Sequence, residues 1–184
     1  MVHSATQMKK AKQTAFSQQI DSIDLLKSQH QEVDDLFKEF EAAKSKAFES
    51  KLHTFEAIAA TLEAHAKIEE AFLYPEGKPV DTDMTLEAYE EHGLIKEVIA
   101  KTRKLNADDE TFDAKVTVLK ELVQHHVKEE EKTYFPELRK ALGKEHLAEL
   151  GAQMKEEFDV MLASNRRGQH DKKRPLAQKA TDLN

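Results

Sequence analysis

Apolar residues recur at three- and four-residue steps along most of the chain, the pattern of helices that bury one face. This periodicity predicts helices over about residues 22–47, 49–74, 82–105 and 111–142, followed by a fifth helix over about 144–163. The sequence shows no segment with the alternating apolar and polar residues that are typical of β-strands. Because short links separate the helices, the sequence predicts an all-α, up-down-up-down four-helix bundle with a short fifth C-terminal helix.

The two chain ends are polar and lack an apolar stripe. Residues 1–20 are rich in Lys and Gln and are predicted to be a flexible N-terminal lead-in, and residues 165–184 are predicted to be a basic, disordered tail. Residues 21–164 then form the bundle domain. Within it, we expect Pro75, Gly77 and Pro79 to end the second helix and Pro136 to kink the fourth.

Composition narrows the chemistry that the chain can carry. The 184 residues include no cysteine, which excludes disulfides, thiolate metal sites, iron–sulfur clusters and a Cys nucleophile. The net charge of −7 gives no reason to expect nucleic-acid binding. Because the sequence contains neither an apolar run of membrane-spanning length nor the apolar core of a secretory signal, we expect no membrane association and a cytoplasmic location.

One phrase occurs twice on the predicted helices. Each copy is a His followed four residues later by Glu, then by a second Glu, with a Pro ten residues after the His. The two copies begin as His65-Ala66-Lys67-Ile68-Glu69 and His126-Val127-Lys128-Glu129-Glu130. A single His, His30 or His92, precedes each copy by nearly the same interval. Each of the four predicted long helices therefore contributes one of these histidines.

The spacing within each copy favours a metal site. Residues four apart on a helix differ by roughly 40° around the axis and about 6 Å along it, so the His and Glu of one copy can reach the same interior. An unpaired carboxylate there costs several kcal/mol, and the inward faces offer no Lys or Arg apart from Lys96. Imidazole and carboxylate together suit a first-row metal, iron first. Two carboxylates among four histidines suggest that each Glu bridges two ions.

Over roughly residues 22–163, this arrangement resembles the hemerythrin-like family of HHE cation-binding domains. The resemblance implies a four-helix bundle around two non-haem iron ions, oxo- or hydroxo-bridged. His30 and His65 would serve one iron, His92 and His126 the other, and the two glutamates of the repeated phrase would bridge them. The metal ligands that it implies are His30, His65, Glu69, His92, His126 and Glu130.

The chain departs from the pattern of oxygen-carrying hemerythrins. Those carriers have a further His four residues after the His of the third helix, where this chain has Lys96. They also place an Asp five residues after the last His, where Glu130 lies four residues away. A water or another side chain would then complete the coordination. Tyr134 and Tyr89 could point at the metals or only pack in the core, and Lys96 would turn outward or remain as a neutral hydrogen-bond partner.

Residues beside the repeated phrase have plainer interpretations. His125 is expected at the surface or next to a metal ligand. The neighbouring glutamates Glu70, Glu129 and Glu131 are expected to be outer-face charges, although any one could turn inward as an extra ligand. Ferritin-like sites use Glu-x-x-His in the opposite order, and the His-Glu-x-x-His phrase of metalloproteases is absent.

Three functions remain open at this stage. The first is a di-iron protein that binds or reacts with O2, peroxide or NO, in oxygen or oxidative-stress handling or in iron sensing. The second is a peroxide-consuming, catalase- or peroxidase-like enzyme, favoured because Lys96 replaces a ligand and leaves a coordination position open. The third is a non-catalytic, metal-binding regulatory module that acts on a separate partner protein.

Overall fold

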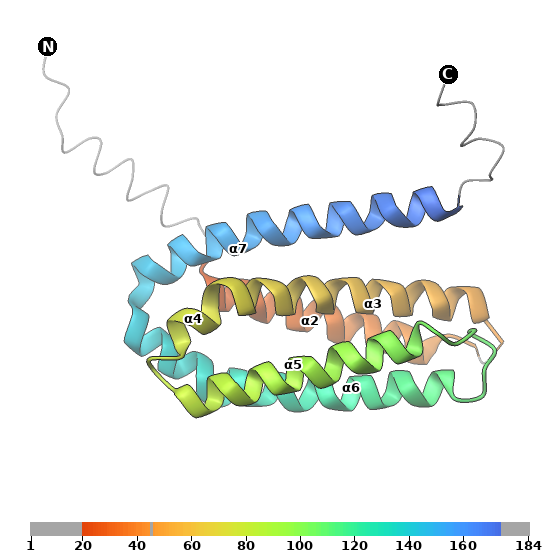
Figure 1. The fold of residues 1–184 in the computed structure, drawn as a ribbon, viewed down its shortest axis with the longest axis horizontal. Helices are drawn as coiled ribbons and strands as arrows, with labels where there is room; N and C mark the ends of the chain where they lie inside the picture. The colour runs from red at the N-terminus through yellow and green to blue at the C-terminus, as the bar shows by residue number, and fades with distance from the viewer. Residues whose placement is uncertain (1–19, 45, 174–184) are drawn as a thin grey trace, which may run out of the picture.

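The structure, a computed structural model, describes residues 20–44 and 46–173. Four long helices, a C-terminal helix, one short helix and two π-helical turns are the regular elements of this part of the chain, and no strand occurs within it. The predicted all-α class is therefore confirmed. The long helices lie side by side in Figure 1. They are α2 (Ser22–Ala42), α3 (Phe48–Ile68), α5 (Thr82–Thr102) and α6 (Phe112–Glu129).

Two of the long helices, α3 and α6, are each followed directly by a π-helical turn. α3 continues into η1 (Glu69–Leu73) and then α4 (Tyr74–Gly77), and α6 continues into η2 (Glu130–Tyr134) and then α7 (Phe135–Lys173). As predicted, the helical run ends at Gly77 and residues 78–80 form a turn. Pro75 itself does not end it, since it lies within α4, directly after the π-turn.

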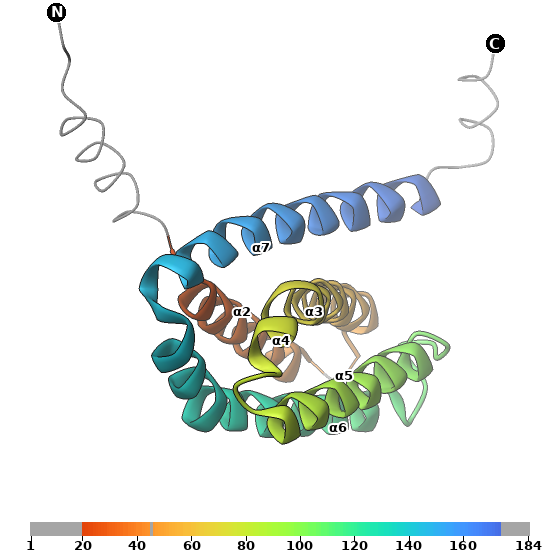
Figure 2. The same cartoon turned by 60° about the vertical axis from the view of Figure 1, so that its left-hand side comes forward.

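The C-terminal helix is longer than its apolar pattern predicts. α7 bends at Gly143, whose φ of 76° and ψ of 163° lie in a region that favours glycine. Beyond this bend it runs over α2 and α3 (Figure 2), and it continues to Lys173 instead of ending near residue 163. The remainder of the predicted basic tail, 174–184, and residues 1–19 of the predicted lead-in lie outside the described residues.

Two buried apolar clusters divide the interior, and the repeated histidines lie between them. On α2, Leu26 belongs to one cluster and Val33 to the other, with His30 between them. On α3, Ile68 and Leu62 flank His65 in the same way. The polar residues therefore occupy one level of the bundle, covered by apolar side chains above and below. None of the described helices is long and apolar enough to cross a membrane.

Candidate metal centre

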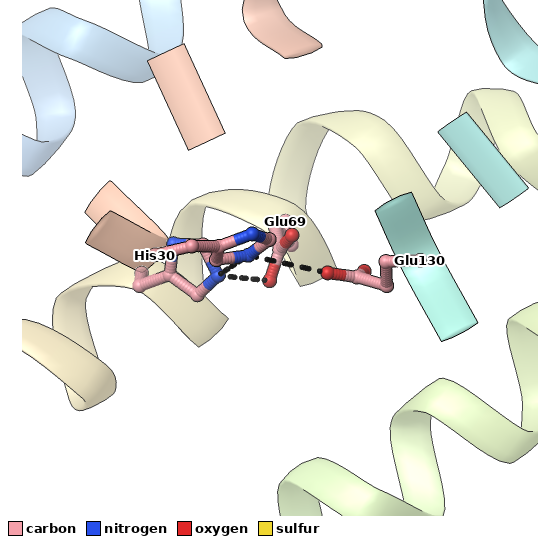
Figure 3. A group of neighbouring side chains, drawn as sticks. His30, Glu69 and Glu130 are labelled. Carbon is pink, nitrogen blue, oxygen red and sulfur yellow. Dashed lines mark hydrogen bonds and ion pairs between the residues drawn. The ribbon is translucent and has the colours of Figure 1, made fainter. Parts of the chain in front are cut away.

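The six residues expected to be metal ligands meet in the interior of the bundle. Their exposed fractions run from 0% for Glu69 to 7% for His30. Figure 3 shows the side chains of His30, Glu69 and Glu130 pointing toward one another. Each long helix contributes one His and each π-turn contributes one Glu, in the order His30, His65, Glu69, His92, His126 and Glu130.

These side chains form two groups that could each hold a cation. The first group is His30, His65, Glu69 and Glu130, and the second is Glu69, His92 and His126, with the ligand atoms of each group lying within 4.8 Å of one another. Glu69 belongs to both groups. Its Oε2 lies 3.1 Å from His65 Nε2 and 3.3 Å from His92 Nε2. Glu130 Oε2 also faces both sides, 3.4 Å from His30 Nε2 and 3.5 Å from His126 Nε2.

Each of the four histidines is oriented by an acceptor on its outer nitrogen. The Nδ1 atoms lie 2.7–3.0 Å from side-chain oxygens, pairing His30 with Glu131, His65 with Gln29, His92 with Glu70, and His126 with Glu91. Because these oxygens accept hydrogen bonds, the ring hydrogen is assigned to Nδ1, and the lone pair of Nε2 faces the interior. This arrangement orients a histidine for metal binding.

The inner nitrogens need a cation between them. His30 Nε2 lies 3.2 Å from His65 Nε2, and His92 Nε2 lies 3.1 Å from His126 Nε2. If all four outer nitrogens carry the hydrogen, lone pairs face each other in both pairs. A metal ion or a proton is then required to relieve the repulsion.

The two carboxylates are also short of partners. Both oxygens of Glu69 and Oε2 of Glu130 are buried without a hydrogen bond from the described part of the chain. Burial and the nearby charge of Glu130 raise the pKa of Glu69 well above its usual value. Burial also acts against the ionised form of Glu130, but His126 and His30 outweigh it and lower the pKa of that carboxyl. Cations would relieve the cost that burial imposes on both ionised groups.

The histidines show the same competition between burial and charge. Burial, reinforced by His30, holds the pKa of His65 well below its usual value. Burial also lowers the pKa of His30 and of His126, but neighbouring carboxylates, Glu130 above all, outweigh it and raise both values. Without a metal, the centre therefore favours a few protons shared among its ligands, and a metal must displace them to bind.

Tyr74 also reaches the centre, although the helical period of the sequence does not indicate it. Its hydroxyl donates to Glu130 Oε1 at 3.1 Å and lies 3.2 Å from His92 Nε2. Burial and the two glutamates of the centre raise the pKa of Tyr74 well above its usual value, so it is a phenol in the metal-free protein. On a regular α-helix Tyr74 would point roughly 140° away from Glu69. In the π-turn, the Tyr74 backbone N–H bonds to the Glu69 carbonyl, which brings the two residues onto one face.

The three further residues considered from sequence are turned to other partners. Tyr134 is buried, and its hydroxyl lies 2.6 Å from Thr85 Oγ1. Tyr89 is 36% exposed, and its hydroxyl donates to the Glu70 carbonyl. Lys96 turns outward, which is one of the two orientations expected from the sequence, and it pairs with the Glu70 carboxylate. His92 and Lys96 together lower the pKa of Glu70 to about 2, so this carboxylate is ionised at neutral pH.

A small cavity lies beside the inner nitrogens. Its volume is about 20 Å³, enough for a guest about the size of one water molecule. Apolar side chains, Val33, Leu62, Ile95 and Val123 among them, line it together with the four histidines. The space next to the centre can therefore hold a small molecule while the walls exclude a larger one.

Comparison with known families identifies this arrangement. The model of the hemerythrin HHE cation-binding domain matches residues 21–138, which include all six candidate ligands. The chain belongs to this family. The domain binds cations, and the two groups around Glu69 are where this HHE protein could hold them.

Two individual proteins are similar to this HHE domain. The crystal structure of a hemerythrin HHE cation-binding domain-containing protein from Mycobacterium kansasii superimposes with a TM-score of 0.69 at 20% identity, covering 79% of this chain and 89% of that one. This likeness shows the shared fold. A protein named DNA nickase from Nostoc sp. (strain PCC 7120 / SAG 25.82 / UTEX 2576) is 26% identical over 144 residues, 78% of this chain. The chain covers only 40% of that relative's length.

Proposed function

We propose that this HHE domain holds two iron ions and uses them to bind or react with a small ligand such as O2, peroxide or NO. The observation that carries the proposal is the pair of buried His/Glu groups joined through Glu69. His30 and His65 would bind one ion, His92 and His126 the other, and Glu69 and Glu130 would bridge them. Iron supplies reversible one-electron chemistry, which the protein groups of the centre lack.

The residues around the ions would each have a distinct task. The outer acceptors keep the four Nε2 lone pairs turned inward. Tyr74 holds a hydroxyl hydrogen against Glu130 and close to His92, where it can donate to an oxygen atom of the ligand. The apolar wall of the small cavity keeps bulk water from the centre and limits the size of the ligand.

Metal analysis and optical spectroscopy test the metal part of the proposal. Protein reconstituted anaerobically with ferrous iron should contain about two iron ions per chain, and oxidation should produce the near-ultraviolet absorption of a bridged ferric pair. Stopped-flow mixing of the ferrous form with O2 should then show an optical change. One metal ion per chain, a preference for zinc, or a ferrous form inert to O2, peroxide and NO would contradict the proposal.

A peroxide-consuming enzyme is the second candidate, and the position of Lys96 favours it. Lys96 stands where a carrier has a histidine ligand, and it pairs with Glu70 instead of entering the centre. One coordination position is then left without a protein ligand, as turnover requires. An oxygen electrode would detect O2 release from added H2O2. A rate no faster than that of the same amount of free iron would exclude this candidate.

The absence of nucleic-acid activity and the cytoplasmic location stay predictions from the sequence. The nickase name belongs to a relative of which this chain matches 40% of the length, while the chain carries a net charge of −7. We infer that a shared HHE domain accounts for the similarity. A gel assay with supercoiled plasmid would check this, and nicking by purified, metal-loaded protein would overturn it.

A further inference from the structure

A groove between α2 and α6 leads from the surface to the edge of the metal centre. It encloses about 480 Å³, and its walls include Lys27, Gln31 and Phe37 on one side and Gln124, Lys128 and Lys132 on the other. Charged side chains of both signs line the groove, since Asp34 and Glu131 stand beside the three lysines. Because the lysines outnumber the carboxylates, such an entrance admits a small anion or a neutral polar molecule.

Only one layer of side chains separates the groove from the small cavity at the centre. His30, Val123 and Val127 line both spaces. His30 is fixed in this wall, because its Nδ1 lies 2.8 Å from Glu131 Oε1 while its Nε2 faces the ligands. Val127 is partly exposed and Val123 is 5% exposed. These two valines and His30 are therefore the side chains that a ligand must pass between the groove and the cavity.

The corresponding face of the other half of the repeat is held by polar contacts. There, Tyr89 and Lys96 on α5 both bind Glu70 in η1. Further along the same seam, Arg103 pairs with Glu56 and Glu63 of α3. On the groove side, the equivalent outer carboxylate, Glu131, has Lys27 Nζ at the longer distance of 3.7 Å. The α2–α6 seam is also bridged further along, where Lys120 Nζ lies 2.6 Å from Glu41 Oε1, so the two faces differ beside the outer carboxylates Glu70 and Glu131.

We propose that the α2–α6 groove is the route by which a small ligand reaches the metal centre, and that Val127 and Val123 form the barrier on this route. The inference rests on the proposed function, since it requires a metal centre that binds an external ligand. The ligand is a molecule or anion of at most a few atoms, of which one enters the cavity behind the barrier, because its volume of about 20 Å³ holds a guest about the size of one water molecule. Azide is a suitable probe of this class.

The test uses azide binding kinetics on di-iron protein with two variants and one control. Gln124→Trp narrows the groove at an exposed position outside the inner cavity, and Val127→Ala thins the barrier. Val118→Trp places the same bulk on α6 at a site that is 48% exposed and lines neither space. Circular dichroism and iron content confirm that each variant is folded and loaded.

Blocking a route changes the barrier but not the free and bound states. Gln124→Trp should therefore slow azide association and dissociation by the same factor, about tenfold, and leave the Kd unchanged. Val127→Ala should speed association, and Val118→Trp should match the wild type. Rates for Gln124→Trp equal to those of the control would overturn the route. If wild-type protein binds neither iron nor azide, the proposed function fails and the route fails with it. Normal azide binding with unaffected rates refutes the route alone.

Discussion

Replacing Glu69 with Gln should make the metal-free protein more stable. The Glu69 side chain is fully buried, and neither of its oxygens receives a hydrogen bond from the described residues. A Gln of the same shape carries no charge, and its NH2 group can donate to His65 Nε2 or His92 Nε2, which lie 3.1 Å and 3.3 Å from Glu69 Oε2. A buried polar group without a partner costs about 1–3 kcal/mol, so the gain should be of that order. For a chain of this size it raises the Tm by roughly 2–12 °C.

The same substitution should weaken stabilisation by metal. In the wild type, iron at a hundredfold excess over its Kd adds about 2.7 kcal/mol to the free energy of unfolding. Gln lacks the charge and the second oxygen that a bridging ligand uses, so less than half of this increment should remain. Thermal melts with EDTA and with ferrous iron, under anaerobic conditions, measure both effects.

Glu130→Gln is the matched control, since Glu130 holds the same place in the second copy of the repeat. Tyr74 donates a hydrogen bond to Glu130, and the neighbouring histidines lower the pKa of Glu130. The negative charge of Glu130 is therefore better compensated than that of Glu69. Glu130→Gln should therefore leave the metal-free protein unchanged or less stable. A metal-free Glu69→Gln protein that melts below the wild type would refute the reasoning, because burying the Glu69 carboxyl, which must stay ionised or take up a proton, would then carry no cost.

Stability should depend on pH with opposite signs in the two metal states. In the folded, metal-free protein the pKa values of Glu69, His30 and His126 are raised and that of His65 is lowered. The three raised groups outnumber His65, so the folded protein binds more protons than the unfolded chain, and its Tm should fall as pH rises from about 6.5 to 8.5. Metal-loaded protein should gain stability over the same range, because ligands bind metal when deprotonated. Plots of Tm against pH with the same slope in both metal states would contradict this. Gly151→Ala should cost more than about 1 kcal/mol in chemical denaturation, since its Cβ would lie 2.6 Å from a backbone oxygen of the segment before α2. Gly93→Ala, with open space around it, should instead stabilise by up to ~1 kcal/mol, and equal effects of the two changes would refute the packing argument.

Much of the fold follows from local periodicity. Regular helices repeat their apolar faces, so the four long helices could be located from residues such as Phe37, Phe55 and Leu119, all of which are buried. The pairing of each His with a Glu four residues later is likewise a property of one helix. The sequence could not supply the path of α7 over α2 and α3, because that path depends on a bend at Gly143 and a close approach at Gly151.

The polar surroundings of the centre were harder to predict, because a π-turn breaks the helical period. Regular α-helical spacing predicts that Tyr134 lies one turn after Glu130 and can face the metals. In the structure, its hydroxyl contacts Thr85 instead. Tyr74 lies five residues after Glu69 and is brought inward by the hydrogen bond between their backbones. A Pro shortly after a buried Glu in both copies is a signal in the sequence that the helix changes its geometry at this point.

The two halves of the centre repeat their ligands but not the groups that orient them. The outer nitrogen of His65 pairs with a neutral amide, Gln29, whereas that of His126 pairs with the carboxylate of Glu91. In the repeat, Tyr74 corresponds to Phe135. The Tyr74 ring stacks on His92 and adds a hydroxyl, while Phe135 stacks on His30 with no polar atom. A carboxylate partner makes an imidazole a stronger donor, so the ion held by His92 and His126 would have the more electron-rich ligands and the nearby phenol. The ion held by His30 and His65 would instead face the groove. An internal repeat can in this way give two inequivalent metal positions, one closer to a hydrogen-bond donor and one closer to the entering ligand.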